Sequence, residues 1–205
     1  MPLEQCFHLR LKLHPELVPV TLVLSMDAQP KITQELTELT GFVEDMRALG
    51  RTPTARLLDK RVVAADEAVA HQLALAPGTL VVRLRRVRLA DGVAMSFDET
   101  YLPREIGEKV AGNDLEAEPV FALLEEKYDT PLVEAEYKLE AAAADSVAAQ
   151  ALQVPPGSPI FLIERTSYTT GNRPVDYERL HYRGDLIRFV TRLARRPRTS
   201  REAPH

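Results

Sequence analysis

The sequence predicts an α+β fold in which an antiparallel sheet with flanking helices is built from two pseudo-repeats. The main observation is that residues 64–92 recur 79 positions later as residues 143–171, with nine identical residues. The second is that a Pro-Gly pair ends a short helical pattern in both copies, at Pro77-Gly78 and Pro156-Gly157. The third is that a long alternating run follows each pair and closes at a glycine turn. Two such helix-hairpin units predict a cleft between the halves, which suits a small ligand.

The first half begins with a helix predicted within residues 37–50. Its apolar residues form one helical stripe, Thr40 can cap its start, and Gly50 suits the left-handed stop. The amides around Gly41 are therefore exposed at the helix start. After a short linker, the chain is expected to form a strand at 55–63, a helix at 66–75, a strand at 79–90 and a return strand at 93–102.

The second half repeats this order after an intervening helical segment. The pattern predicts helical turns at 103–110, a helix at 119–127, a strand at 132–142, a helix at 144–152, strands at 159–170 and 174–182, and a closing edge strand at 189–193. Long antiparallel hairpins with helices to one side are typical of the α+β class.

Composition excludes several classes of protein. The chain has 205 residues, 27% charged, 45% apolar and a net charge of -4, so nothing in the overall balance favours nucleic acid or an anionic membrane. Cys6 is the only cysteine, which rules out a disulfide within the chain and favours a reducing, cytoplasmic setting. The apolar run at 17–24 is too short for a membrane span. Cys6, His8 and His14 lack the spacing of metal ligands, so no metal is expected.

One predicted strand places two arginines at the end of an aliphatic row. Because side chains alternate along a strand, Arg86 and Arg88 share a face with Leu80, Val82 and Leu84. One interpretation is that both arginines are solvated at the hairpin tip. The other is that they close a cavity and clamp an anion, because a partly desolvated guanidinium favours a planar acidic partner. The spacing alone leaves both open.

The return strand brings Asp98 near these arginines on one of two faces. A two-residue loop at Asp91-Gly92 would place Asp98 opposite Arg85. A three-residue loop beginning at Ala90 would place it on the face of the two arginines instead. Both loops are compatible with the sequence.

In the second hairpin, Asp176, Glu178, Leu180 and Tyr182 share a face. Such acids can decorate a surface or accept hydrogen bonds from the hydroxyls of a polar ligand. The sequence contains no Gly-x-Ser-x-Gly motif and no phosphate-binding glycine loop. We therefore predict no catalytic residues and no cofactor.

Five segments at joint spacing resemble one family, over about residues 28–196. They are FVEDMRALGRTPTARL at 42–57, RVRLADG at 86–92, ETYLP at 99–103, the second helix with Pro156-Gly157, and YRGD at 182–185 followed by Arg192-Leu193. Together they resemble the UTRA domain, the effector-binding and dimerisation half of GntR-type bacterial transcription regulators of the HutC subfamily. The resemblance implies a chorismate-lyase-like fold, a homodimer, and an effector held between the two pseudo-repeats.

The resemblance also implies a set of ligand-binding residues. In relatives that sense phosphorylated sugars, the phosphate rests on backbone amides and two arginines, at positions similar to Gly41, Phe42 and Val43 and to Arg86 and Arg88. Sugar-side acids and a tyrosine correspond to Asp98, Asp176 and Tyr182, which favours the three-residue loop. Hydroxyl residues common in the family are replaced here by Gly41, Val43 and Pro119. A sugar phosphate, a carboxylate or a bulkier polar ligand are therefore equally open.

The expected organisation has three parts. Residues 1–30 form an atypical segment without the winged helix of the family, residues 31–196 the ligand-binding and dimerisation domain, and residues 197–205 a disordered tail. The expected function is sensing of a small anionic effector, with DNA bound only through a winged-helix module that this chain lacks. Two alternatives stay open. One is a chorismate-lyase-like enzyme in which Arg86 and Arg88 grip a carboxylate, and the other is an interaction domain with a vestigial cleft.

Overall fold

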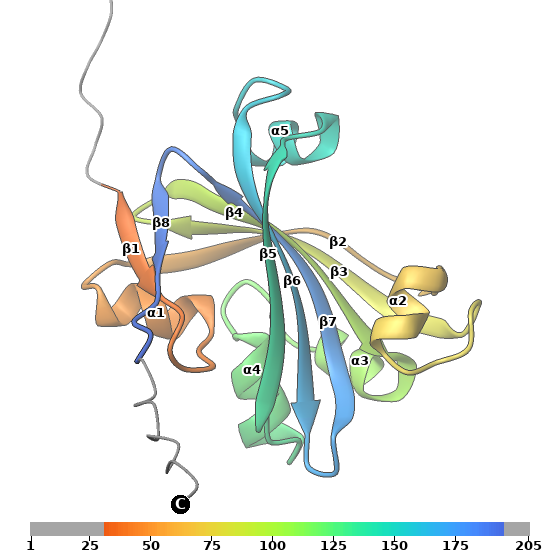
Figure 1. The fold of residues 1–205 in the computed structure, drawn as a ribbon. Helices are drawn as coiled ribbons and strands as arrows, with labels where there is room; N and C mark the ends of the chain where they lie inside the picture. Colours follow the sequence, from red (N-terminus) through yellow and green to blue (C-terminus); the bar gives the residue numbers. More distant parts are fainter. Residues whose placement is uncertain (1–30, 195–205) are drawn as a thin grey trace, which may run out of the picture.

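The computed structural model describes residues 31–194 and contains a strongly twisted six-stranded antiparallel sheet (Figure 1). Its strands follow the order β2-β3-β4-β7-β6-β5. They are β2 (Pro53–Ala64), β3 (Leu80–Ala90), β4 (Val93–Pro103), β5 (Glu134–Ala143), β6 (Pro159–Thr169) and β7 (Arg173–Arg183). The predictions for residues 1–30 and 197–205 lie outside the described residues.

The strand order is symmetric about the β4-β7 pair, which confirms the two pseudo-repeats. Strands β2, β3 and β4 correspond to β5, β6 and β7, and helix α2 (Glu67–Gln72) corresponds to α5 (Ser146–Leu152). Both helices are capped by an aspartate whose side chain accepts from a backbone amide at 2.8 Å, Asp66 in α2 and Asp145 in α5. The Pro-Gly stops also match, with φ of +80° at Gly78 and +82° at Gly157.

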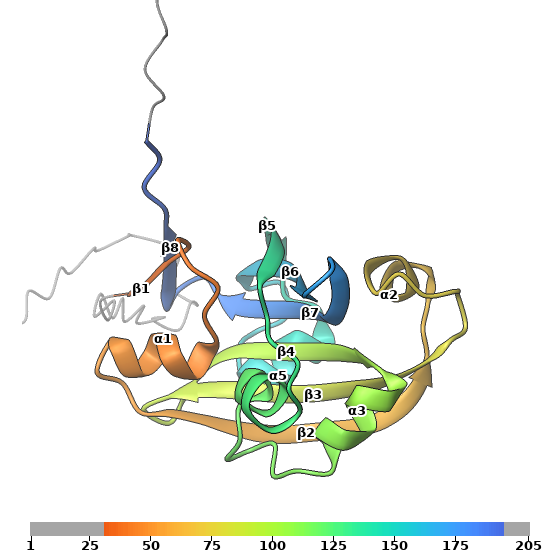
Figure 2. The ribbon, with the colours of Figure 1, turned by 90° about the horizontal axis from the view of Figure 1, so that it is seen from below.

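The remaining helices are α1 (Phe42–Ala48), α3 (Arg104–Ala111), α4 (Val120–Ala122) and the π-helical turn η1 (Leu123–Lys127). The prediction that all helices lie to one side of the sheet is wrong (Figure 2). Adjacent residues of β3 show this, because Val82 packs in a core cluster with Val110 of α3 whereas Val81 packs with Val69 of α2. We call the side that carries α1, α3 and α4 the pocket face.

A small second sheet was only partly foreseen. Strand β8 (Ile187–Val190) overlaps the predicted edge strand, but it does not extend the large sheet. It pairs in parallel with β1 (Ile32–Glu35), a strand that the sequence pattern did not predict. None of the helices in residues 31–194 combines the length and the apolar character that crossing a membrane requires.

The β3-β4 hairpin resolves the two loop alternatives in an unexpected way. The loop has two residues, Asp91 and Gly92, both with positive φ, so the prediction of a three-residue loop is wrong. Asp98 nevertheless lies opposite Arg86, because the register shifts beyond Arg88 and leaves Met95 as an extra residue in β4. This β-bulge moves Asp98 to the pocket face, which a regular ladder would not do.

Candidate ligand-binding site

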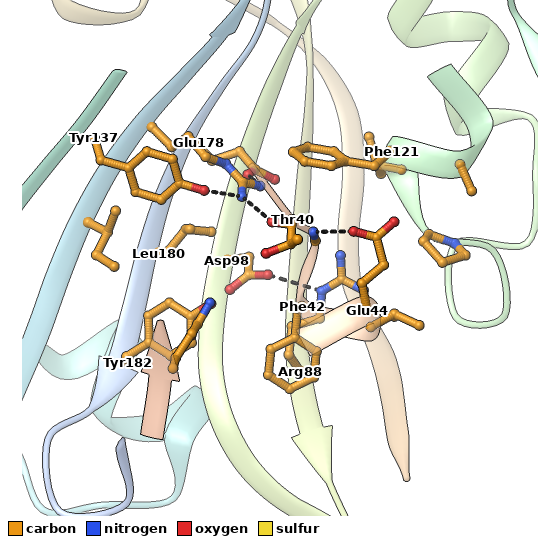
Figure 3. A pocket seen from close by; sticks show the side chains of 18 of the residues that line it. Thr40, Phe42, Glu44, Arg88, Asp98, Phe121, Tyr137, Glu178, Leu180 and Tyr182 are labelled. Atoms are coloured by element: carbon orange, nitrogen blue, oxygen red, sulfur yellow. Dashed lines mark hydrogen bonds and ion pairs between the residues drawn. The ribbon is translucent and has the colours of Figure 1, made fainter. Parts of the chain in front are cut away.

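A pocket lies on the pocket face, where the start of α1 meets the start of α4 above β4, β6 and β7 (Figure 3). The cavity has a volume of about 140 Å³. Phe42 and Phe121, which are 79 residues apart, both line it, so the two pseudo-repeats contribute equivalent aromatic rings. Gly41 lies close to the second ring, since a Cβ atom there would stand 3.6 Å from Phe121 Cδ2. The pocket is thus formed between the two halves of the fold.

The structure brings six of the eight predicted site residues to this cavity. Its lining includes Gly41, Phe42, Val43, Arg88, Asp98 and Tyr182. Arg86 and Asp176 do not line it. Both are completely buried in the sheet behind the cavity, with no exposed surface. The interpretation of the arginines as solvated at the hairpin tip is wrong, because Arg88 is also buried.

Two carboxylates on the floor of the pocket are already paired with arginines. Arg88 Nε donates to Asp98 Oδ2 at 3.0 Å, and Ser96 Oγ donates to Asp98 Oδ1 at 2.6 Å. Arg165 forms the corresponding ion pair with Glu178. Although burial opposes it, the charges of Arg165 and Arg86 lower the pKa of Glu178. Glu178 is therefore held ionised beneath the cavity, and Asp98 is fixed there by its ion pair with Arg88.

Arg86 is a buried cation without a carboxylate of its own. Its Nη2 lies 3.5 Å from Thr100 Oγ1, while Nε and Nη1 have no hydrogen-bond partner among residues 31–194. Burial and the neighbouring Arg88 lower the pKa of this guanidinium to about 9. The cluster therefore holds three arginines against two paired carboxylates, and its charge is positive as long as Asp176, the third buried carboxyl group, is protonated.

Arg165 is a pocket residue that the sequence reasoning missed as a site residue. Its guanidinium carbon stands 4.4 Å from the centre of the Phe121 ring. Its Nη1 donates to Tyr137 Oη at 3.0 Å and to the Thr40 carbonyl at 3.4 Å. The signal was present in the sequence, because Arg165 is the repeat partner of Arg86.

The start of α1 presents backbone donors to the same cavity. The Gly41 amide donates to Glu44 Oε2 at 2.9 Å, so the chain's own carboxylate occupies that donor. The amides of Phe42 and Val43 lie in the first helical turn, where backbone donors have no partner within the helix. Thr40 and Gln34 both donate to the Asp45 carboxylate, which fixes the loop against α1.

Asp176 and Tyr182 differ in their place at the site. Tyr182 lines the cavity, and burial together with the nearby Asp98 charge raises its pKa well above the usual range. Asp176 lies deeper, and burial together with the Glu178 charge raises its pKa to about 7. Within residues 31–194, no three His, Cys, Asp or Glu side chains converge in a way that could hold a metal ion.

The arrangement suits a small ligand that carries both negative charge and hydrogen-bond donors. Arginines and helix-start amides can accept an anion, while Asp98, Glu178 and Tyr182 can meet hydroxyl or amino groups. Comparison with known proteins identifies the family. The sequence model of the UTRA domain matches residues 48–188.

The chain belongs to the UTRA domain family. The HTH-type transcriptional repressor NagR of Bacillus subtilis (strain 168) is 30% identical over 163 residues, which cover 80% of this chain and 67% of NagR. The crystal structure of PhnF from Mycobacterium smegmatis has a TM-score of 0.74 and 27% identity, covering 82% of this chain and 74% of that one. The crystal structure of the separate effector domain of PhnF also has a TM-score of 0.74. It is 26% identical and covers 80% of this chain and 100% of that domain.

These relatives confirm the predicted family and fold. The UTRA domain described here is homologous to the effector domains of transcription regulators. The chain spans 67% of NagR and 61% of the regulator Rv0792c of Mycobacterium tuberculosis.

Proposed function

We propose that this chain is the effector-sensing domain of a GntR/HutC-type transcription regulator and that it binds a small anionic metabolite, either a sugar phosphate or a carboxylate. The observation that carries the proposal is the unbalanced buried charge of Arg86, directly behind a cavity lined by Arg88, Arg165 and helix-start amides. A buried, unpaired guanidinium is costly to the fold, and an anion in the cavity offsets that cost.

In this proposal the domain acts without chemistry of its own. It works as a cytoplasmic homodimer, it is not an enzyme, and DNA is bound only through a winged-helix module outside residues 31–194. Effector binding controls transcription by favouring one arrangement of the dimer over another. The relatives support this, because the matched proteins are transcription regulators rather than enzymes.

Calorimetric titration with sulfate tests the anion site directly, whichever anion the natural effector is. We expect the wild-type protein to bind sulfate weakly, because one small anion makes only some of the effector's contacts. Arg88→Gln should abolish this binding, since Arg88 lines the cavity. Arg85→Gln is the matched control, because Arg85 lies on the same strand but pairs with Glu99 on the opposite face.

A panel of phosphosugars, amino acids and organic acids then distinguishes the effector classes by thermal stabilisation. The proposal predicts a member that binds more tightly than sulfate and competes with it. If Arg88→Gln binds sulfate as the wild type does, or if no anion stabilises the protein, the proposed site is wrong and an interaction domain with an unused cleft is favoured.

A further inference from the structure

Asp176 is a buried carboxylate that does not reach the pocket. It has no exposed surface, and neither of its carboxylate oxygens has a hydrogen-bond partner among residues 31–194. Ser167 lies opposite it in the β6-β7 ladder, near enough to lower the pKa of Asp176, but its hydroxyl does not reach the carboxylate with the geometry of a hydrogen bond. Buried polar atoms in this state are uncommon in proteins, and an unpaired buried carboxylate is strongly driven to take up a proton.

A second carboxylate competes with Asp176 for the same arginine. Glu178 lies two residues further along β7, so both side chains project from one face of the strand. Glu178 holds Arg165 in an ion pair and also accepts from Thr100 Oγ1 at 2.9 Å. The Nη1 of Arg165 is engaged by Tyr137 and the Thr40 carbonyl. Two adjacent buried carboxylates that share one guanidinium cannot both ionise at ordinary cost.

The other groups around Asp176 do not relieve this competition. On β6 the facing groups are Arg165 and Ser167, which lower the pKa of Asp176 by less than burial and Glu178 raise it. On β3, the charge of Arg86 lowers the pKa of Glu178. The pairing of β4 with β7 ends at Tyr101 and Tyr177, so the next residue of β4 on the side of Asp176 is Leu102. Leu102 is apolar and packs in a cluster with residues of α4 and η1. Arg165 is therefore the cation that acts most strongly on Asp176, and Glu178 already holds it.

We propose that Asp176 is a positioning residue for Arg165, and that binding of an anion in the pocket is coupled to uptake of a proton at Asp176. The inference rests on the proposed anion-binding function. With Asp176 protonated, Arg165 stays with Glu178 at the floor of the cavity, where it attracts the ligand. Once ionised, Asp176 adds a negative charge behind the cavity and draws the guanidinium away from it. An anion and a charged Asp176 therefore oppose each other, and the effect is reciprocal.

Sulfate titrations at two pH values test this coupling, because sulfate does not change its charge between them. We expect wild-type affinity to be about three- to tenfold weaker near pH 8 than near pH 6. Asp176→Asn carries no titrating group at this position. At both pH values, this variant should bind sulfate with the affinity that the wild type has near pH 6. Asp185→Asn is the control, since it removes an exposed carboxylate paired with Arg183 and should keep the wild-type slope.

Each outcome decides a different point. A wild-type affinity that is unchanged by pH, or an unchanged slope in Asp176→Asn, overturns the coupling and leaves the anion site intact. Absence of sulfate binding at both pH values overturns the anion site and the coupling together. Should Asp176→Asn not fold, NMR of the carboxyl carbons in the wild type decides instead. An aspartate that titrates near 7 and shifts upward with sulfate supports the coupling, and one that does not shift contradicts it.

Discussion

At the scale of single residues, the site is defined by charges that the fold holds out of water. Arg86 has no carboxylate of its own, Asp176 has no hydrogen-bond partner in the described chain, and both are fully buried. Such groups cost stability unless they are neutralised or serve a ligand. The effect of these groups on stability and their effect on anion binding can be measured separately by substitution.

Arg86→Met should make the protein more stable and less able to bind anions. Methionine fills similar space without a charge, so the substitution removes the cost of burying an unpaired cation. We expect a gain of about 1–2 kcal/mol, seen as a rise in Tm of about 2–8 °C. Sulfate binding should be lost in calorimetry.

Arg85→Met is the control on the same strand. It breaks a partly exposed pair with Glu99, so it should change stability by less than about 1 kcal/mol and keep sulfate binding. A loss of stability in Arg86→Met together with normal sulfate binding would show that Arg86 has a structural role only.

Asp176→Asn should stabilise the protein in a pH-dependent manner. Burial raises the folded-state pKa of Asp176 from 3.8 to about 7, so the folded protein binds its proton more tightly than the unfolded chain. The wild type therefore loses stability as pH rises between these two values, and asparagine does not. The gain in Tm from Asp176→Asn should be larger near pH 8 than near pH 5. Equal gains at both pH values would contradict a buried titrating carboxylate.

At the scale of elements, the two pseudo-repeats differ in what surrounds their equivalent arginines, Arg86 and Arg165. Tyr137 of β5 and Leu57 of β2 hold equivalent places, opposite Arg165 and Arg86 in their ladders. Tyr137 lines the cavity, whereas Leu57 packs against the apolar cluster built around α3. The residue opposite the arginine is thus part of the apolar core in the first half and part of the pocket in the second.

Gly107 is the residue that lets α3 pack this closely. A Cβ atom at this position would stand 2.7 Å from Val82 Cβ and 2.8 Å from Val82 Cγ2 on β3. Alanine favours a helix by about 1 kcal/mol over glycine, but this overlap should outweigh the preference. We expect Gly107→Ala to lower stability by about 1–3 kcal/mol in chemical denaturation. Glu105→Ala, on an exposed position of the same helix, should have little effect, and a stabilised Gly107→Ala would show that α3 can shift.

The sequence predicted the elements better than their contacts. The repeated Pro-Gly stops and the aliphatic alternation located both hairpins, because these signals are local. The Met95 bulge was not foreseen, since no residue type specifies it and only sheet pairing shows the register. Strand β1 was missed because its short polar segment becomes a strand only by pairing with β8, far away in the chain. Arg165 was missed because two of its pocket contacts, with Phe121 of α4 and with the Thr40 carbonyl before α1, come from segments far away in the sequence.

At the scale of the whole molecule, the pocket connects the two halves with the small β1-β8 sheet. Gln34 of β1 lines the cavity and donates to Asp45 of α1, and Asp45 also accepts from Thr40. Arg165 of the second half donates to the Thr40 carbonyl. A ligand that moves Arg165 thus acts on the segment at the N-terminal end of the described chain. This geometry matches what the proposed sensing function requires.

The most direct measurement is a crystal structure of the protein soaked with selenate, whose anomalous signal locates the anion. We predict a peak in the cavity, within hydrogen-bonding distance of Arg88 and the amides of Phe42 and Val43, with Arg86 and Arg165 behind it. Selenate found only at surface sites, with the cavity free of anomalous density and Arg86 still unpaired, would contradict an anion-sensing pocket between the two halves.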